Sequence, residues 1–251
     1  FANYVVIGLA NGKLAIIDIE TGQLLWEPKV ADPKGDTEIE RIVDVDGAPI
    51  FIGDKLFAVS YQGQIVAYDL KNGRLLWAED DSSYRDLGAG FGNIYVSGAD
   101  GIVTAYDEQT GTVKWANDNF LRRRLTAPAV VSSYVVVADY EGYIHLLSQV
   151  DGHIVARKRV NGSGVKTPIA VDGSRFYVRA NNGRLKAYVQ QGGWATVTSK
   201  EVLKPGYWYL ATLSVGAGKA ALFLNGQSQG EVKLKKPMPA TQAPITLGGI
   251  H

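Results

Sequence analysis

A sixteen-residue motif recurs along this chain and leaves few folds open to it. The motif occurs in full at residues 11–26, 62–77 and 100–115. A fourth copy at residues 141–156 has lost the final Trp, and a fifth at residues 182–188 stops after one strand. In the first four copies two glycines lie ten residues apart, and the three full copies end in Trp. These repeat residues are Gly12, Gly22, Trp26, Gly63, Gly73, Trp77, Gly101, Gly111, Trp115, Gly142 and Gly152.

Each copy has the pattern of a strand, a tight turn and a second strand. In the first copy, residues 14–19 alternate with the period of two that is typical of a strand. Glycine follows in the turn, where it adopts positive φ without a Cβ clash. Asp18, Asp69 and Asp107 end the first strand of the full copies, where a carboxylate accepts hydrogen bonds from turn N–H groups. We interpret these aspartates as structural, and a catalytic role is the alternative.

The spacing of the copies predicts the fold class. From Gly12, the first glycine recurs after 51, 38 and 41 residues. A period near forty with about four strands per unit is typical of a β-propeller, whose blades bury their apolar faces against neighbouring blades. We therefore predict an all-β chain in which residues 1–190 form a partial β-propeller of about four four-stranded blades. The motif's Trp is expected to pack between neighbouring sheets.

Composition excludes several classes of function. The net charge is +1, which gives no reason to expect binding of nucleic acid or of an anionic membrane surface. There is no Cys, so disulfides, thiol catalysis and thiolate zinc ligands are excluded. No apolar run is long enough for a transmembrane helix. The histidines His145, His153 and His251 are far apart and lack metal-ligand spacing. We expect no catalytic residue, no metal and no cofactor.

The character of the sequence changes after Gln190. The repeat pattern stops, and residues 207–215, 219–224 and 228–234 have the pattern of strands. Asn225-Gly226 is the strongest short hairpin signal of the chain. The predicted organisation is therefore a partial propeller at residues 1–190 and an antiparallel β-sandwich fragment of jelly-roll type at residues 191–251.

Residues 1–190 resemble the propeller repeats of quinoprotein dehydrogenases, because residues 12–26 match the repeat G-x-L-x-A-x-D-x-x-T-G-x-x-x-W at nearly every marked position. Within that superfamily the chain resembles more closely the BamB family, the propeller lipoproteins of the machinery that inserts β-barrels into the bacterial outer membrane. This narrower match is carried by residues 37–41 together with 44–46, by residues 125–128 and by residues 141–145.

The resemblance to the BamB family implies a non-enzymatic scaffold of eight blades at the periplasmic face of the outer membrane. Such a scaffold docks onto the periplasmic domains of the barrel-assembly subunit, in part through two aspartates that flank one residue. Asp44 and Asp46 fit this pattern, with Arg41 close by, and they are the expected partner-binding residues. The alternative is that they are ordinary loop charges. The chain opens within a strand pattern, which indicates a piece of something longer, and the resemblance implies that this piece is the C-terminal half of such a propeller. We expect it to have no signal peptide or lipid anchor, and hence to be a recombinant cytoplasmic product.

The C-terminal segment resembles a second family. Residues 208–211, 221–226 and 245–249 are similar to parts of the concanavalin/laminin-G-like jelly roll. Two incomplete pieces from unrelated families indicate an engineered or recombined chimera. Because each piece would expose sheet edges, we expect a homo-oligomer formed by exchange of strands or segments.

Two other functions compete with the scaffold hypothesis. The shared repeat suggests a quinone-dependent dehydrogenase, but those enzymes commonly use adjacent cysteines near the quinone, and this chain has none. The jelly-roll resemblance suggests carbohydrate binding, with Trp194, Tyr207, Trp208 and Tyr209 stacking on a pyranose. The alternative for these aromatic residues is that they fill the core between two sheets.

Overall fold

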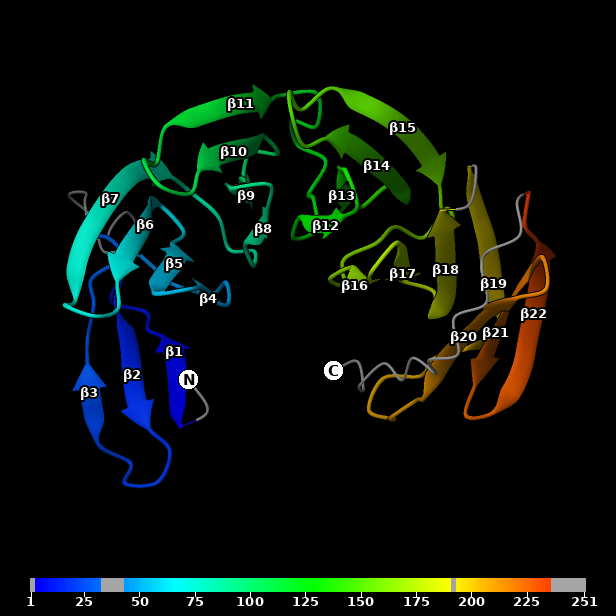
Figure 1. Ribbon diagram of the computed structural model, residues 1–251, viewed down its shortest axis with the longest axis horizontal. Coiled ribbons are helices and arrows are strands. Elements are labelled where there is room, and N and C mark those ends of the chain that lie inside the picture. Colours follow the sequence, from blue (N-terminus) through cyan, green and yellow to red (C-terminus); the bar gives the residue numbers. More distant parts are fainter. Residues whose placement is uncertain (1–2, 33–42, 191–192, 236–251) are drawn as a thin grey trace. The chain divides into compact units, whose positions relative to one another are not determined.

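The computed structural model describes residues 3–32, 43–190 and 193–235, and every regular element in these ranges is a β-strand (Figure 1). The chain divides into two compact units. The first comprises the chain up to Pro128 together with Gln149–His153. The second comprises Ala129–Ser148 and the chain from Ile154 onward.

The first unit contains three antiparallel sheets in which neighbouring strands follow one another in sequence. The sheet β1-β2-β3 consists of Tyr4–Gly8, Leu14–Asp18 and Leu24–Trp26. The sheet β4-β5-β6-β7 consists of Ile50–Ile52, Lys55–Val59, Gly63–Asp69 and Arg74–Asp81. The sheet β8-β9-β10-β11 consists of Gly88–Gly90, Asn93–Ser97, Val103–Asp107 and Val113–Asn117.

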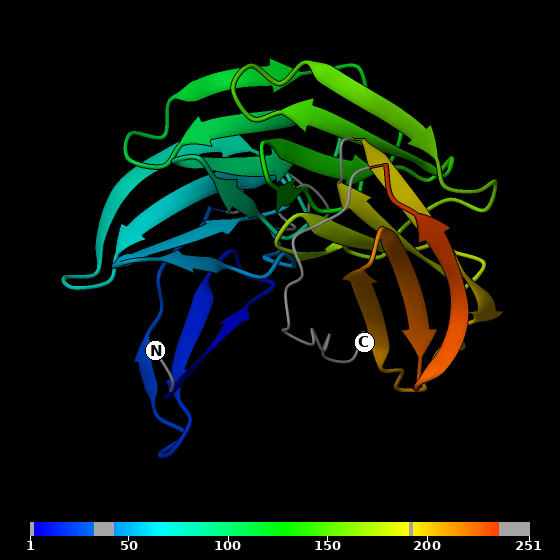
Figure 2. The ribbon, with the colours of Figure 1, turned by 45° about the vertical axis from the view of Figure 1, so that its right-hand side comes forward.

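The second unit repeats the same topology in three further sheets. The sheet β12-β13-β14-β15 consists of Ala129–Val131, Tyr134–Ala138, Tyr143–Ser148 and Ile154–Arg159. The sheet β16-β17-β18-β19 consists of Ala170–Asp172, Arg175–Arg179, Arg184–Gln190 and Trp194–Val202. The sheet β20-β21-β22 consists of Ala211–Gly216, Lys219–Leu224 and Gln227–Lys233, and its three strands run side by side in Figure 2.

These sheets confirm the predicted fold class. The described residues form four four-stranded meanders, the blade type of a propeller, with one three-stranded sheet before them in sequence and one after. The four long copies of the motif coincide with the last two strands of the first four sheets, β2-β3, β6-β7, β10-β11 and β14-β15. The inner strands are apolar on both faces, as strands covered on both sides should be. In β13, for example, Val135, Val136 and Val137 are all fully buried.

The hairpin turns follow from the aspartate of the three full motifs and from the second glycine of all four long copies. The carboxylate Oδ1 of Asp18 accepts the N–H groups of Glu20 and Thr21 at 2.9 and 2.8 Å. Asp107 does the same for Gln109 and Thr110, both at 2.9 Å. The second glycines adopt φ of 68–75°, the left-handed region that glycine occupies without strain; they are Gly22, Gly73, Gly111 and Gly152.

The first glycine of each motif lets another segment of the chain pack closely against it. At Gly12, Gly101 and Gly142 φ is again positive, and an added Cβ would come within 2.1–2.4 Å of a backbone carbonyl oxygen. The carbonyl oxygen of Gly142 accepts the N–H of Val160, just after β15, at 2.7 Å. Gly63 differs, because the positive φ falls on the preceding Gln62, yet a Cβ at Gly63 would lie 2.2 Å from Ser60 Oγ.

In the first unit, the motif's Trp joins one hairpin to the turn of the next. Trp77 is nearly buried, and its indole N–H donates to the carbonyl oxygen of Glu108 at 3.2 Å. Trp115 donates in the same way to Gln149 at 3.0 Å. Each indole lies against the second glycine of the following motif: Trp26 against Gly73, Trp77 against Gly111 and Trp115 against Gly152. The same contact between an indole and a glycine therefore recurs from each motif to the next.

In the second unit, the C-terminal segment is built onto the last repeat. Strand β19 pairs with β18 from Gln190↔Trp194 to Arg184↔Val202 and supplies the outer strand of that sheet. The next sheet shares a core with it, because Leu185, Ala187 and Val197 pack together with Leu213 and Leu222. Gln229 on β22 accepts the N–H groups of Lys200 and Glu201 through its side-chain oxygen. The predicted boundary between residues 1–190 and 191–251 falls at the junction 191–193, of which residues 191–192 lie outside the described residues, and the division into domains at that point stays a prediction.

Candidate functional site

The two aspartates of the predicted partner-binding segment are displayed by an anchored stretch of backbone. Val43 and Val45 are buried, whereas Asp44 between them is half-buried and Asp46 is exposed. Val43 forms a parallel bridge with Asn11, and the N–H of Tyr61 donates to the carbonyl oxygen of Asp44 at 2.7 Å. Alternation along an extended backbone therefore turns both carboxylates away from the core. Arg41, the third residue of the prediction, lies outside the described residues.

In the described part of the chain, the acidic pair lacks a neutralising cation. Partial desolvation raises the pKa of Asp46 above its usual value, and the neighbouring Asp44 carboxylate raises it further. Within the described ranges neither carboxylate forms an ion pair. A cation supplied by another molecule would remove this repulsion, since opposite charges at short range favour the ionised form.

Aromatic and basic groups that the sequence analysis did not single out lie next to this segment. The rings of Tyr61 and Tyr84 are 6.2 Å apart, and the guanidinium carbon of Arg85 lies 4.7 Å from the centre of the Tyr84 ring. A Cβ at Gly47 would lie only 2.3 Å from the carbonyl oxygen of Arg85, so the two stretches of backbone are in direct contact. No sequence signal indicated this, because the aromatic and basic groups lie 15 to 41 residues from the acidic pair and outside the repeated motif.

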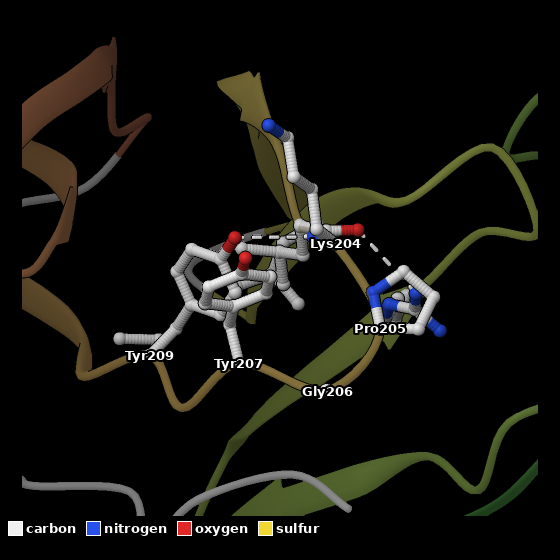
Figure 3. A pocket seen from close by; sticks show the side chains of 9 residues that line it. Lys204, Pro205, Gly206, Tyr207 and Tyr209 are labelled. Atoms are coloured by element: carbon white, nitrogen blue, oxygen red, sulfur yellow. Dashed lines mark hydrogen bonds between the residues drawn. The ribbon is translucent and has the colours of Figure 1, made fainter.

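A second candidate site is a cleft in the second unit (Figure 3). Its volume is about 140 Å³, and the loop between β19 and β20 forms much of its wall. The lining residues are Arg179, Leu185, Leu203, Lys204, Pro205, Gly206, Tyr207, Tyr209 and Ala211. Leu185, Leu203 and Ala211 belong to the buried core, so the cleft has an apolar floor.

Two hydrogen bonds fix the polar groups of the cleft. The N–H of Lys204 donates to the hydroxyl oxygen of Tyr209 at 3.1 Å, while the lysine side chain extends away from the two tyrosine rings in Figure 3. Arg179 on β17 donates through Nη2 to the carbonyl oxygen of Leu203 at 3.4 Å. The cleft therefore combines tyrosine rings with one guanidinium group that is held in place.

The aromatic residues predicted to stack on a sugar do not all come together. Tyr207 and Tyr209 line the cleft. Trp194 instead packs in the core, with its ring 5.1 Å from that of Phe176 and 6.3 Å from that of Tyr134. Trp208 is 63% exposed and is absent from the lining of the cleft.

His145 and His153 are also separate from both sites. His145 Nε2 lies 2.8 Å from the buried carboxylate of Asp139, and His153 Nδ1 lies 2.6 Å from Asp151. His251 lies outside the described residues. No group of three or more potential metal ligands occurs in the part of the chain that the structure describes. In the same ranges, no helix has the length and apolar character that crossing a membrane requires.

Comparison with known proteins shows one family over most of the chain. A profile described as "Outer membrane protein assembly factor BamB" matches residues 2–117 and 99–198. The protein of that name from Pseudomonas aeruginosa is 50% identical over 186 residues, which are 74% of this chain and 49% of that protein. The one from Vibrio cholerae is 42% identical over 185 residues, 73% of this chain and 48% of that protein. The chain thus spans about half the length of these relatives.

Solved structures agree with the sequence comparisons. The crystal structure of BamB from Moraxella catarrhalis matches with a TM-score of 0.68 and 30% identity, over 72% of this chain and 54% of that one. The computationally designed Ika8 protein matches with a TM-score of 0.55 and 16% identity, over 98% of this chain and 90% of that one. This second likeness concerns the fold alone, and it extends over the C-terminal segment. The jelly-roll resemblance and the fusion origin of that segment stay predictions.

Proposed function

The chain belongs to the BamB family of outer membrane protein assembly factors, and from this premise we propose that it is a non-enzymatic scaffold that binds a protein partner through Asp44 and Asp46. The observation that carries the proposal is the geometry of this pair. Two carboxylates project from an anchored segment, repel one another and have no cation of their own in the described residues. A basic group on a partner would neutralise both.

The surroundings of the pair favour protein recognition. Tyr61, Tyr84 and Arg85 are half-exposed beside it, and Tyr and Arg are the residue types enriched among the energetically important residues of protein interfaces. The proposed partner is the periplasmic part of the outer-membrane barrel-assembly subunit, and the proposed location is the periplasmic face of the outer membrane. Both proposals rest on membership of the family.

A pull-down with the purified periplasmic domains of the barrel-assembly subunit tests the scaffold proposal. We expect the double substitution Asp44→Ala and Asp46→Ala to reduce capture at least about tenfold, as expected when a charged pair is lost from an interface. The control removes two acidic groups elsewhere in the same unit, Glu20→Ala with Asp54→Ala, and should leave capture unchanged. Equal capture by both variants would refute the assignment of the site.

We also propose that the chain associates with a second copy of itself. The first sheet leaves large apolar side chains uncovered: Val5 is 42% exposed, Ile19 56% and Leu24 55%. Gly22 on the same sheet has no group within 4 Å of an added Cβ, whereas the later turns meet an indole there. A second copy of the chain that contributes a strand or a sheet would cover this surface. Light scattering at micromolar concentration should then give a mass above 27.1 kDa, and a strictly monomeric chain would exclude it.

Carbohydrate binding by the C-terminal segment is a second candidate function. It is favoured by the presence of Tyr207 and Tyr209 in one cleft. Aromatic side chains in a concave site provide the flat apolar surface on which a pyranose ring stacks. Titration calorimetry with neutral sugars such as D-glucose tests this function, and heats that match buffer dilution would argue against it.

A further inference from the structure

We infer that the cleft between β17 and the loop 203–210 selects a single ring that carries a carboxylate. The inference deepens the second candidate function, since it concerns the same cleft, but it specifies the charge of the ligand. Neutral sugars test the carbohydrate-binding function, and charged rings test the selection of a carboxylate. Either proposal can therefore fail alone.

The dimensions of the cleft set the size of the ligand. Its volume of about 140 Å³ is close to that of the cavity of about 150 Å³ that accommodates benzene. A single six-membered ring therefore fits, whereas a second linked ring would have to extend into solvent. The floor of Leu185, Leu203 and Ala211 and the rings of Tyr207 and Tyr209 provide apolar contacts for such a ring.

Arg179 determines the charge of the ligand. The guanidinium group has five N–H donors in a planar fork that suits the two oxygens of a carboxylate. Within the described residues, its side chain donates one hydrogen bond, from Nη2 to the carbonyl oxygen of Leu203. That bond fixes the group at the cleft wall and leaves further donors available. No Asp or Glu lines the cleft, so the guanidinium has no competing carboxylate there.

The unit around the cleft adds a favourable electrostatic potential. Fourteen Lys and Arg residues of the second unit stand against five Asp and Glu, whereas the first unit has twelve against twenty. Two of the five acidic residues, Asp172 and Glu231, form ion pairs within the unit, and Asp139 is bonded to His145. The excess positive charge attracts an anion to this unit more strongly than the net charge of +1 for the whole chain suggests.

Titration calorimetry on the whole chain at low ionic strength tests the inference with two matched pairs of ligands. D-glucuronate is compared with D-glucose, and benzoate with benzyl alcohol. We expect at least one of the two acids to bind at least about tenfold more tightly than its neutral partner, as expected for one charge-assisted bidentate contact. Binding of glucuronate alone would identify a sugar acid, and binding of benzoate alone an aromatic acid. Equal affinity for acid and neutral partner in both pairs would overturn the inference.

Substitutions test whether Arg179 supplies the positive charge that binds the acid. Arg179→Gln should weaken binding of the acid at least about tenfold and leave any binding of the neutral ring within about twofold. Arg184→Gln is the matched control, because Arg184 is an exposed arginine of the next strand, outside the lining of the cleft; it should change affinity by less than about threefold, the effect of one distant charge. Arg179→Lys keeps the charge, and if Arg179→Gln alters the loop it should restore most of the affinity. Unchanged binding in Arg179→Gln, or an equal loss in Arg184→Gln, would contradict the assignment.

Discussion

At the scale of single residues, the second glycine of each motif has two separate tasks. It adopts positive φ in the turn, and it leaves room for the Trp of the preceding motif. The space for an added Cβ decreases along the chain. At Gly22 it would meet nothing within 4 Å, and at Gly73 it would lie 3.6 Å from Trp26. At Gly111 and Gly152 it would lie only 2.6 and 2.3 Å from the indoles of Trp77 and Trp115.

Substitution of these glycines by Ala should separate the two tasks. Gly22→Ala should destabilise the chain by roughly 1–2 kcal/mol, because only the left-handed backbone conformation opposes it. Gly111→Ala and Gly152→Ala should cost an additional 1–3 kcal/mol or so from overpacking against the indole. Urea unfolding followed by circular dichroism measures the series. Equal losses at Gly22 and Gly152 would show that the indole contact is not maintained in solution.

The indole itself should account for much of the stability of the join between blades. Trp77→Ala removes a side chain that is only 8% exposed and leaves the carbonyl oxygen of Glu108 without its donor. We expect a loss of about 3–5 kcal/mol in the free energy of unfolding. Trp208→Ala, at 63% exposure, is the control and should cost less than about 1 kcal/mol. A similar small effect at both positions would contradict the packing role.

At the scale of elements, the turn aspartates connect the hairpins to pH. Hydrogen bonds from Lys114 and from the turn lower the pKa of Asp107 from 3.8 to about 2. A carboxyl group with a lowered folded-state pKa stabilises the fold above its unfolded pKa, and this contribution is lost as the pH falls through the folded pKa. Asp107→Asn should therefore lower the melting temperature at pH 7, and its difference from the parent chain should shrink towards pH 2. A difference independent of pH would refute an ionic contribution.

The acidic pair should also link binding of a basic partner to pH, with affinity increasing as the pH rises. The pKa of Asp46 is raised in the free chain, first by desolvation and then by Asp44. A cation on the partner lowers that pKa, so binding releases a proton, and affinity should increase as the pH rises through the raised pKa of the free chain. Asp46→Asn should flatten this profile. Affinity that is constant in the parent chain from pH 4 to pH 7 would contradict the role of Asp46.

The sequence predicted elements well where the pattern was local and less well where tertiary contacts decide. The alternation and turn chemistry of the motif predict β6 and β7 closely, because both strands obey local rules. The predicted strand at residues 207–215 begins instead at Ala211, since Gly206 has φ of +80° and Tyr209 bonds back to Lys204. The outer strand β19 was not predicted, because it carries no copy of the motif. Its strand conformation is defined by pairing with β18.

The candidate sites follow the same division. The prediction of Asp44 and Asp46 as a site rests on the family resemblance, which includes the segment around them, and it stays a prediction. Tyr61, Tyr84 and Arg85 come beside them only through contacts between segments outside the motif, which a periodic pattern does not specify. The cleft could not be predicted for a similar reason, since Arg179 belongs to a repeat and Tyr209 to the segment after it.

At the scale of the whole molecule, the balanced net charge conceals two units of opposite charge. Asp and Glu dominate the first unit, which carries the proposed partner-binding pair, and Lys and Arg dominate the second, which contains the cleft. Overall composition averaged these contributions to +1 and therefore gave no reason to expect an anion site. Charge counted over compact units is the more informative quantity, because electrostatic effects fall off within about a Debye length of 8–10 Å.

The shared core of the second unit makes the C-terminal segment part of its stability. Leu222 on β21 is fully buried in the cluster that also contains Leu185 and Val189 of β18. Ending the chain after Gln190 would expose these two residues, so we expect a lower urea midpoint for the shortened chain than for the whole one. In the whole chain, Leu222→Ala should cost about 2–5 kcal/mol, whereas the exposed Lys219→Ala should have little effect. If residues 191–251 instead fold as an independent domain, the shortened chain will keep its midpoint, and Leu222→Ala will shift only a separate second transition.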